Sequence, residues 1–389
     1  MITVYHPKGG RLNKNRQILF VSTSYPKDKR DWRGRFIANI IEALSRHDSV
    51  RLKVWTPPGK LPVNAWYVCL ESEADWLSRL MAKGGIAHIM RSKKAFAFGT
   101  IFSLLHRLRK LYKREAEDCH VAHVNWLQNV LPLWGTSTPA VVTVLGNDLG
   151  LLNLPGMKFA LRQVIRQRAC VIAPNADWMV SKLNPVFGDI AKIQPVPFGV
   201  DDVWFRINRD PFTDRKRIWL SITRLTRKKI GTLFEWGQGR FSDSDELHLF
   251  GPMQEQIHLP DWVVYHGPVS PDELISEWFP NACGLITLSQ HDEGRPQIML
   301  EAMAAGIPVI ASPLDAHTDI IEHGKTGCIS RSTEEFDEAI RLISDPVKNL
   351  DIGKRAKKWI RENIGTWDDC ANRFIKIYDF LLREEKNEQ

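Results

Sequence analysis

Short apolar runs alternate with amphipathic stretches along most of the 389-residue chain. Apolar runs bounded by turn residues are typical of buried parallel strands, and the stretches between them have helical spacing. The pattern predicts two groups of strands. The first group comprises 17–22, 52–56, 121–124, 140–145 and 170–173, and the second comprises 217–223, 246–250, 263–266, 284–288 and 308–311. This order favours an α/β chain with two doubly wound parallel sheets.

A segment rich in proline and glycine separates the two groups of strands. Residues 194–201 read Gln-Pro-Val-Pro-Phe-Gly-Val-Asp, which interrupts any regular element. Single hydrophobic cores seldom exceed about 250–300 residues, so the chain length also favours two domains. We expect a first domain over 1–195 and a second over 196–367. The stretch 368–389 has apolar residues at helical spacing and is predicted to be a helix that needs a surface to cover it.

Charge is distributed unevenly between the two predicted domains. The composition as a whole, 43% hydrophobic and 25% charged, is that of a globular protein and argues against disorder, collagen-like repeats and coiled coils. Residues 1–200, however, carry a net charge of +16, whereas the remainder carries −8. A basic domain favours an anionic partner, which could be a phosphorylated substrate, an anionic membrane face or nucleic acid.

We expect neither a membrane-spanning segment nor a secretory signal. The uncharged stretch 95–106 is well short of the roughly 20 residues that span a bilayer. The first 20 residues lack an apolar region before a small-residue cleavage site, so we expect a cytoplasmic protein. The six cysteines are far apart in the sequence and form no Cys-x-x-Cys pair, which predicts reduced, mostly buried thiols and no zinc site.

A basic amphipathic segment covers residues 91–114. Its apolar residues at helical spacing are Phe98, Ile101, Leu105, Leu108 and Tyr112, and its cations Arg107, Lys110, Lys113 and Arg114 lie largely away from them. One interpretation is a helix that lies on anionic lipid, on the inner face of the cytoplasmic membrane. The other is a helix packed on its own domain with a solvated basic face, and both can hold together.

The most specific stretch, 288–310, is predicted to be strand, loop, helix and strand. Pro296 suits the first turn of a helix and Gly306 suits a left-handed residue after its end, so the helix is expected over 296–305. The start of a helix has free N–H groups and a positive dipole end. Together these can bind a phosphate or a sugar hydroxyl.

Two glutamates in this stretch are candidate ligand-binding residues. Glu301 is in an otherwise apolar helix, where it is costly to bury unless a ligand with two donors, such as a vicinal diol, takes its oxygens. Glu293 lies in the loop before the helix. The alternatives are an ordinary acidic residue at a helix N-terminus for Glu293 and a surface glutamate for Glu301.

These residues belong to a longer motif that resembles a known family. Glu293 and Glu301 are separated by seven residues, and Glu-Gly-x-Pro-x-x-x-x-Glu-Ala-Met-Ala-x-Gly-x-Pro-Val resembles the EX7E signature of retaining glycosyltransferases of family 4. Residues 221–229 resemble that family's strand-end Arg-Leu-x-x-x-Lys, and 197–201 its interdomain Pro-x-Gly-Val-Asp. Closer to the start, 24–26 with 33–36 and then 145–148 resemble its first βα loop and its His-Gly-Ser-Asp turn.

The resemblance implies a GT-B fold, in which two Rossmann-like domains face each other across a cleft and the last helix crosses back onto the first domain. It implies that Arg224 and Lys229 neutralise the diphosphate of the donor and that Glu301 holds the ribose hydroxyls. It also implies that Glu293 contacts the donor sugar, with the backbone of Gly294, Arg295 and Pro296. The residues it marks as catalytic are Glu293, Arg224 and Lys229; Gly34 is a further donor-site residue, and Asn147 and Asp148 are candidates for the acceptor side of the cleft.

The chemistry of such a transfer agrees with these residue types. A nucleoside diphosphate gains charge as it leaves, and fixed cations with helix N–H groups can stabilise that charge without a metal ion. We therefore expect no metal and no cofactor. Two departures from the family pattern stand out: Leu145 occupies the place of a frequent histidine, and 314–319 replaces a Gly-Gly-x-x-Glu loop with a bulkier, more acidic segment.

The expected function is a retaining transfer of a sugar from a nucleotide-diphosphate sugar to a glycan or lipid-linked acceptor during synthesis of a bacterial surface polysaccharide. One alternative is a basic nucleic-acid-binding protein, suggested by a pI of about 9.1 and fourteen tryptophans. Against it, the sequence has no recognised nucleic-acid-binding module, and we expect no nucleic-acid partner. A GT-B phosphorylase or an inactive scaffold is a further alternative, weakened by the intact pair of Glu293 and Glu301.

Overall fold

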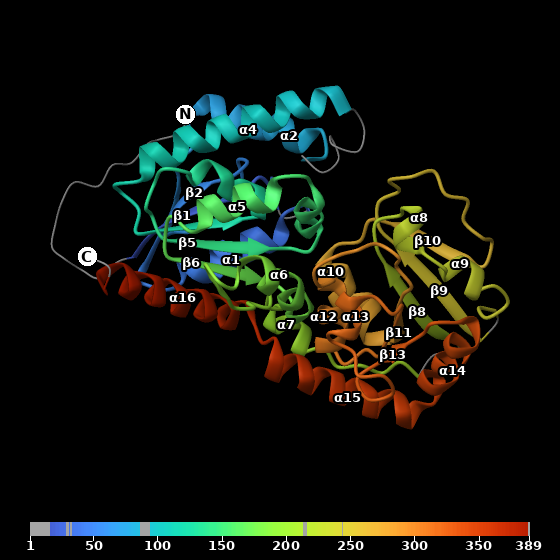
Figure 1. Ribbon diagram of the computed structural model, residues 1–389. Helices are drawn as coiled ribbons and strands as arrows, with labels where there is room; N and C mark the ends of the chain where they lie inside the picture. The colour runs from blue at the N-terminus through green and yellow to red at the C-terminus, as the bar shows by residue number, and fades with distance from the viewer. Residues whose placement is uncertain are drawn as a thin grey trace.

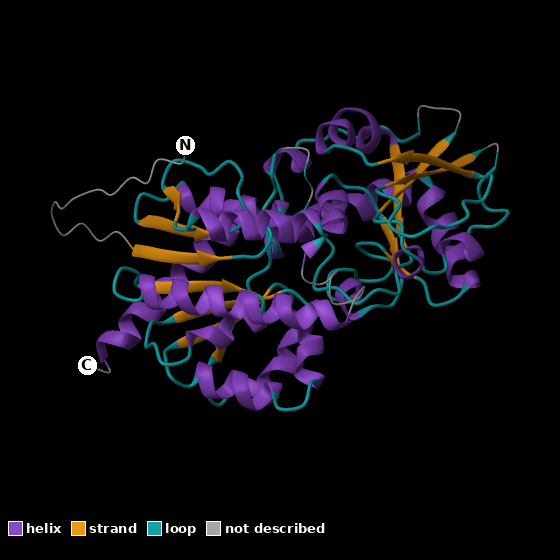
Figure 2. Cartoon of the chain, turned by 90° about the horizontal axis from the view of Figure 1, so that it is seen from above, coloured by secondary structure: helices purple, strands orange, loops and turns teal. Residues whose placement is uncertain are grey.

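The computed structural model describes residues 16–28, 31, 33–85, 94–212, 216–242 and 244–387. It contains two parallel sheets, each placed between layers of helices, as Figures 1 and 2 show. The predicted α/β class with two doubly wound sheets is therefore confirmed. Residues 1–15 of the first predicted domain and 91–93 of the basic segment lie outside the described residues.

The first sheet has the strand order β3-β2-β1-β4-β5-β6-β7, and all of its paired strands are parallel. In register, Ile18 of β1 lies beside Leu52 of β2 on one side and Val121 of β4 on the other. The strands are β1 (Arg16–Val21), β2 (Val50–Trp55), β3 (Ala65–Tyr67), β4 (Val121–Asn125), β5 (Ala140–Val144), β6 (Cys170–Pro174) and β7 (Lys192–Ile193).

The second sheet has the order β10-β9-β8-β11-β12-β13 and is also parallel throughout. Its strands are β8 (Arg217–Ile222), β9 (Asp245–Phe250), β10 (Val263–Gly267), β11 (Ala282–Thr287), β12 (Val309–Ala311) and β13 (Cys328–Ile329). The ten predicted strands are all present. The strands that the sequence pattern did not predict, β3, β7 and β13, are only two or three residues long, too short to show a hydrophobic period.

Alternate residues of the first sheet belong to two different cores. Ile18 and Phe20 of β1 pack with α1 (Arg35–Ser45) and α16 (Trp367–Asn387), whereas Leu19 and Val21 face the opposite layer. That layer contains α2 (Glu71–Ala82), α4 (Lys94–Glu115), α5 (Met157–Ile165), α6 (Val180–Phe187) and the 3-10 helix η1 (Leu127–Leu133). Because a strand presents successive side chains to opposite faces, a strand buried on both sides reads as a continuous apolar run.

The second sheet is covered in the same way. One face packs against α7 (Asp202–Phe205), α12 (Gln297–Ala304) and α15 (Pro346–Asn363), and the other against α8 (Arg227–Ile230), α9 (Leu233–Trp236) and α14 (Thr333–Ser344). Met299 and Met303 of α12 and Ile360 of α15 are buried together in the first of these cores. The smaller helices α10 (Pro271–Glu273), η4 (Leu274–Trp278) and α11 (Phe279–Asn281) connect β10 to β11.

The last helix, α16, leaves the second sheet and packs on the first (Figure 1). It follows a turn at Gly365, whose φ of 73° suits glycine. The hydroxyl of Tyr378 on α16 lies 2.6 Å from Nδ1 of His123 on β4, and the other ring nitrogen of His123 lies 2.8 Å from the Thr143 hydroxyl. All three side chains are buried, so these hydrogen bonds fix the helix on the sheet.

Helix α4 confirms a helix within the basic segment, and its packed face agrees with the predicted one at Leu108 and Tyr112 but not at Phe98. Leu104, Leu108, Leu111 and Tyr112 are buried, whereas the side chain of Phe98 is 75% exposed. The sequence contains two apolar stripes on this helix, and helical spacing alone does not say which of them meets the core. No helix of the described residues is long and apolar enough to cross a membrane, and all six cysteines are free thiols, five of them buried.

Candidate functional site

The predicted site residues lie beyond the carboxyl ends of strands, where the strand order reverses. The reversal falls between β1 and β4 in the first sheet and between β8 and β11 in the second. Ligands of doubly wound proteins bind in the crevice at such points. Arg224 lies in the loop after β8, Lys229 lies in the short helix α8 that follows this loop, and Glu293 lies in the loop after β11. The fold therefore brings together residues that are about seventy positions apart.

Close backbone contacts hold these loops together. At Gly231, which has a φ of 56°, a Cβ atom would lie 1.8 Å from the carbonyl oxygen of Leu288. Gly34 plays a similar part in the first sheet: its φ is 71°, and a Cβ atom would lie 2.5 Å from the hydroxyl of Ser24. Both positions require glycine for a tight turn and a close approach.

Lys229 and Glu293 form an ion pair. The Thr226 side chain accepts a hydrogen bond from the Lys229 amide and thereby starts α8. The ammonium group of Lys229 lies 2.6 Å from Oε2 of Glu293, and these side chains are 11% and 18% exposed. Burial lowers the pKa of Lys229, Glu293 opposes this shift, and the charge of Arg224 adds to it. Arg224 is thus close enough for its charge to act on Lys229.

Glu293 is held ionised by its neighbours. Burial acts to raise the pKa of this carboxyl, but His317 and the charge of Lys229 outweigh burial and lower the pKa to about 2. Nε2 of His317 lies 3.9 Å from Oε1 of Glu293. Glu293 is therefore an anion with one oxygen on Lys229 and the other facing a histidine.

Glu301 has the opposite electrostatic environment. Burial raises the pKa of Glu301 to about 8, with a further contribution from Asp201, although the Gln297 side chain opposes the shift. Glu301 is partly buried on α12, between fully buried apolar neighbours. A surface glutamate would keep its ordinary pKa, so the surface alternative does not describe this residue.

The start of α12 differs by one residue from the prediction. Pro296 is the N-cap, with extended backbone angles, and the helix begins at Gln297. The side-chain amide of Gln297 donates to the carbonyl of Gly199 over 2.9 Å, which ties the helix start to the predicted interdomain segment. Gly306 has a φ of 80° after the helix, as predicted.

The loop after β11 also touches the first domain. A Cβ atom on Gly146 would lie 2.4 Å from the backbone nitrogen of Gly294, so the two chains are in direct contact there. The indole N–H of Trp178 donates to the carbonyl of Gly294 over 2.7 Å, and the Trp178 backbone N–H donates to Asp319 over 3.2 Å. The predicted turn at 145–148 and the predicted donor loop therefore meet.

Arg295 joins the same contact between the domains. Its side chain is 2% exposed and forms ion pairs with Asp319 and with Asp177, the latter at 3.4 Å. Asp177 belongs to the first sheet's helical layer and Asp319 to the second domain. Arg295 thus bridges the two halves of the chain through its guanidinium group, while the resemblance assigned only its backbone to the donor.

The two predicted acceptor-side residues have different environments. Asn147 is exposed. Asp148 is only 4% exposed, and its carboxylate accepts hydrogen bonds from the backbone N–H groups of Leu127 (3.1 Å) and Leu145 (2.9 Å). Burial raises the pKa of Asp148 to about 6, against these backbone hydrogen bonds. This geometry makes Asp148 an organiser of the turn and leaves Asn147 as the side chain that a ligand can reach.

Trp178 and His317 contact the predicted site, and Trp126 lies at the reversal point of the first sheet, although sequence reasoning assigned none of the three to the site. Trp126 follows β4 at the reversal point of the first sheet and has a φ of 69°, a rare value for a residue other than glycine. Strained backbone of this kind concentrates at functional sites. None of the three belongs to the family motif, and only the replacement of the usual glycine-rich loop by 314–319 drew attention to the region of His317.

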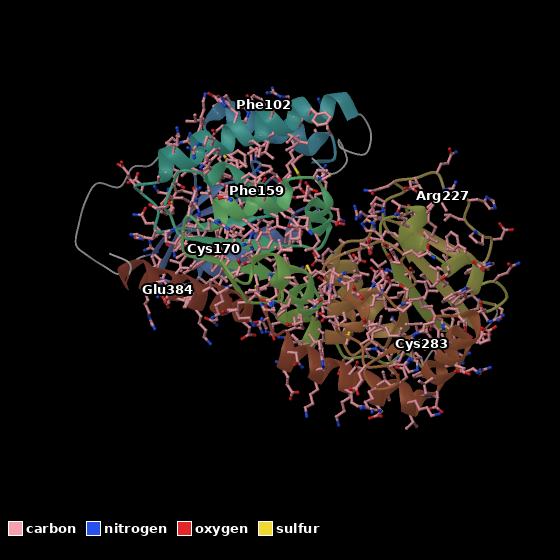
Figure 3. The ribbon with its side chains drawn as sticks, in the orientation of Figure 1. Phe102, Phe159, Cys170, Arg227, Cys283 and Glu384 are labelled. Atoms are coloured by element: carbon pink, nitrogen blue, oxygen red, sulfur yellow. The ribbon has the colours of Figure 1, made fainter. Side chains whose placement is uncertain are left out.

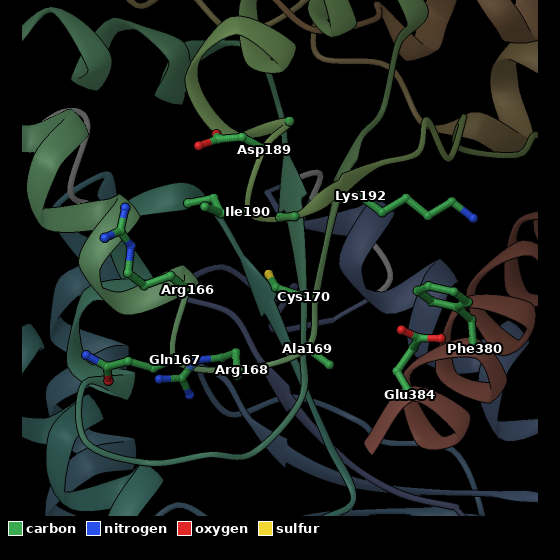
Figure 4. A pocket seen from close by; sticks show the side chains of 12 residues that line it. Arg166, Gln167, Arg168, Ala169, Cys170, Asp189, Ile190, Lys192, Phe380 and Glu384 are labelled. Carbon is green, nitrogen blue, oxygen red and sulfur yellow. The ribbon is translucent and has the colours of Figure 1, made fainter. Parts of the chain in front are cut away.

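One hollow on the surface lies away from these residues. It has a volume of about 470 Å³ and is found at the amino ends of β6 and β7, next to α16. Figure 4 shows Lys192 extending from β7 towards Phe380 on α16, with its ammonium group 4.7 Å from the ring centre. The predicted residues of the first sheet, Gly34, Asn147 and Asp148, lie at the opposite, carboxyl edge of that sheet, so this hollow is not part of the predicted site.

Comparisons with known proteins agree with this geometry. Residues 222–345 match the family model Glycosyl transferases group 1. The chain is 26% identical over 267 residues to N-acetyl-alpha-D-glucosaminyl L-malate synthase of Bacillus anthracis, covering 63% of this chain and 67% of that protein. It is 28% identical over 268 residues to the GDP-mannose-dependent alpha-(1-6)-phosphatidylinositol monomannoside mannosyltransferase of Mycobacterium tuberculosis, covering 62% and 68%.

The fold is shared with solved glycosyltransferase structures. Sucrose-phosphate synthase from Thermosynechococcus elongatus superposes with a TM-score of 0.71 at 15% identity, over 95% of this chain and all of that one. The architecture is therefore the two-domain GT-B fold. The second domain thus matches the group 1 glycosyltransferases, and the family model, the relatives and the fold together support glycosyltransferase function.

Proposed function

We propose that this glycosyltransferase moves a sugar, with retention of configuration, from a nucleotide-diphosphate sugar to a glycan or lipid-linked acceptor. The observation that carries the proposal is the Lys229–Glu293 pair at the reversal point of the second sheet, with Arg224 close by and Glu301 in the following helix. Two cations and two carboxylates in this arrangement suit a diphosphate, a sugar and a ribose.

Each residue has a defined part in this proposal. Arg224 and Lys229 meet the diphosphate, on which negative charge grows as the bond to the sugar breaks. The backbone N–H groups at the start of α12 add donors to the same region. Glu301 accepts hydrogen bonds from the ribose hydroxyls, and Glu293 accepts from the donor sugar. The acceptor approaches past the exposed Asn147.

A thermal-shift screen of UDP, GDP, ADP and CMP tests the donor site. A ligand at a hundred times its dissociation constant stabilises the folded state by about 2.7 kcal/mol, which gives a clear shift in melting temperature. The Glu301→Ala variant should remain folded but show no shift. The proposal fails if no nucleotide stabilises the wild-type protein, or if Glu301→Ala binds nucleotide as the wild type does.

Retention of configuration at the anomeric carbon agrees with the route that is open to the acceptor proton. A β-phosphate oxygen on the face of the departing group can take that proton, so no side-chain base is needed, and Leu145 occupies the place of the family's frequent histidine. We expect an α-linked product from an α-linked sugar nucleotide, and turnover in the presence of EDTA. NMR of the anomeric proton and an assay with chelator test this, and a β-linked product or a Mg²⁺-dependent recovery would contradict it.

The proposed pathway is the synthesis of a bacterial surface polysaccharide in the cytoplasm, at the inner face of the membrane. The relatives named above act on different acceptors, malate and a phosphatidylinositol mannoside, so they support a sugar transfer without fixing the acceptor. The protein can be incubated with isotope-labelled sugar nucleotide and membranes of the source cell, and the products can then be extracted. This experiment distinguishes a lipid-linked acceptor from a small soluble one. Label in a lipid-linked glycan supports the proposal, and label only in a small soluble product contradicts it.

The basic helix α4 supports a peripheral contact with an anionic membrane. Phe98 and Phe102, one turn apart, are 75% and 73% exposed, and Lys110 and Lys113 are exposed further along the helix. Figure 3 shows Phe102 on the outer side of α4. An exposed aromatic pair next to lysines is the combination that inserts into a headgroup layer.

Vesicle flotation tests this contact. The wild-type protein should float with vesicles that contain phosphatidylglycerol and much less with phosphatidylcholine alone. Phe98→Ser with Phe102→Ser should reduce flotation, whereas Val347→Ser, at a 78% exposed apolar residue of α15, should not. Equal flotation of the double variant would remove α4 from the contact.

A further inference from the structure

His317 lies on the short helix α13 (Asp315–Thr318), in the segment that replaces the usual glycine-rich loop, and its side chain is fully buried. Nδ1 of the ring is 2.9 Å from the carbonyl oxygen of Ser312 and 3.2 Å from the Ser312 hydroxyl. That hydroxyl donates its own hydrogen to the carbonyl of Ser289. Both groups near Nδ1 must therefore accept, so Nδ1 carries a proton.

The tautomer decides what the other ring nitrogen can do. With a proton on Nδ1, Nε2 of the neutral ring has a lone pair and accepts a hydrogen bond, whereas Nε2 of the protonated ring donates one. Nε2 is buried and has no hydrogen-bond partner among the described residues. It faces Oε1 of Glu293 over 3.9 Å, and this carboxylate is also an acceptor.

In the neutral form of the ring, Nε2 and the Glu293 carboxylate are two acceptors that face each other in a buried site without a donor between them. An unsatisfied buried acceptor is destabilising, and such groups in native proteins usually have a partner in water or a ligand. The partner here must offer hydrogen-bond donors to two neighbouring positions. Adjacent hydroxyl groups of a sugar ring do so, whereas phosphate oxygens of a diphosphate only accept.

We propose that His317 binds the donor sugar: Nε2 accepts a hydrogen bond from one sugar hydroxyl, and Glu293 accepts from the neighbouring hydroxyl. The inference rests on the proposed donor site and adds a specificity-determining residue to it.

Two substitutions separate this role from a structural one. In His317→Asn the side-chain amide N–H₂ can take the position of Nδ1 and keep the hydrogen bond to Ser312, but the acceptor at Nε2 is lost. In His317→Gln the longer side chain returns an acceptor towards Glu293. The matched control is His323→Asn, an exposed histidine whose Nδ1 also lies against the backbone, 3.1 Å from Ile329.

Calorimetry then compares the nucleoside diphosphate with its sugar nucleotide for the base that the thermal-shift screen identifies, for example GDP with GDP-mannose or UDP with UDP-glucose. We expect His317→Asn to weaken binding of the sugar nucleotide about 2- to 12-fold, the range of one neutral hydrogen bond. Binding of the nucleoside diphosphate should stay unchanged, His317→Gln should recover part of the loss, and His323→Asn should behave as the wild type.

Other outcomes overturn the inference in distinguishable ways. An equal loss for both ligands would mean that a protonated ring meets the diphosphate. A lower melting temperature with unchanged affinities for both ligands would make His317 a purely structural residue. If the wild-type protein binds no nucleoside diphosphate and no sugar nucleotide, whichever base they carry, the proposed donor site itself is wrong. The inference about His317 is then wrong as well.

Discussion

The ammonium group of Lys229 lies 2.6 Å from the Glu293 carboxylate, although Lys229 lies in α8 after β8 and Glu293 lies in the loop after β11. The pair is largely buried, so each charge compensates the other while no donor is bound. A diphosphate that enters the site offers Lys229 a second anion, and the sugar offers Glu293 hydrogen-bond donors. Donor binding therefore exchanges one set of partners for another and leaves neither charge unpaired.

Replacement of Lys229 by alanine should lower kcat more than it raises KM. Lysine meets the charge that grows on the leaving diphosphate, and loss of one such group typically costs on the order of 100-fold in rate. Steady-state kinetics with the matched substitution Lys228→Ala, at an exposed neighbour in α8, provides the control. A change in KM alone would assign Lys229 to ground-state binding.

The raised pKa of Glu301 makes stability depend on pH. In the folded, ligand-free protein the pKa is about 8, whereas an unperturbed glutamate has 4.5. Between these values the folded state keeps a proton that the unfolded state has lost, so the contribution of Glu301 to stability is fully present below pH 4.5 and is lost as the pH rises through 8.

Glu301→Gln removes this titration. We expect the melting temperature of the wild type to fall relative to that of Glu301→Gln as the pH is raised from 5 to 8, measured without nucleotide. Using the difference between the two proteins cancels the titration of all other groups. Parallel curves for the two proteins would show that Glu301 is ionised in the folded state at neutral pH.

Most of the fold could be predicted because it depends on local pattern. Strands buried on both faces read as apolar runs, and the motif between Glu293 and Glu301 placed a loop and a helix to within one residue. The chosen face of α4 could not be predicted, because Leu104 and Phe98 are equally apolar and only tertiary packing distinguishes them. The strands of two or three residues were not predicted, because so short a segment shows no hydrophobic periodicity.

The site was only partly predictable for a similar reason. Lys229 and Glu293 each belong to a motif, and their meeting follows from parallel strands that end at one edge. Trp178 donates to Gly294, which is 116 positions away in the sequence. This contact could not be predicted, because the sequence around Trp178 matches no motif of the family. The role of Asp148 could not be predicted from the sequence either. The burial of its carboxylate and the two backbone N–H groups that donate to it are properties of the folded turn.

Asp148 and Asn147, adjacent in sequence, should respond differently to alanine. Asp148→Ala leaves the backbone N–H groups of Leu127 and Leu145 without an acceptor, so we expect a loss of about 1–3 kcal/mol in the free energy of unfolding. Asn147→Ala should leave stability unchanged and raise KM for the acceptor. Urea unfolding and acceptor kinetics on both variants test this pair. A stable Asp148→Ala protein with weakened acceptor binding would reverse the two assignments.

Gly294→Ala should impair the approach of the two domains while each domain stays folded. The backbone of Gly294 has an ordinary φ, but a Cβ atom there would lie 2.4 Å from Oδ1 of Asn175 and 2.6 Å from the carbonyl of Leu145, both in the first domain. The backbone at Leu145 cannot yield as a flexible side chain does, so the loop and the first domain must separate. Because Arg224 and Glu301 remain in place, nucleotide affinity should persist while kcat/KM falls on the order of 100-fold.

Small-angle X-ray scattering of the Gly294→Ala variant should show a larger radius of gyration than that of the wild type. The control is Gly150→Ala, where a Cβ atom meets nothing within 4 Å, and this variant should match the wild type in every measurement. Wild-type turnover in Gly294→Ala would show that the contact between these two loops is not part of the active arrangement.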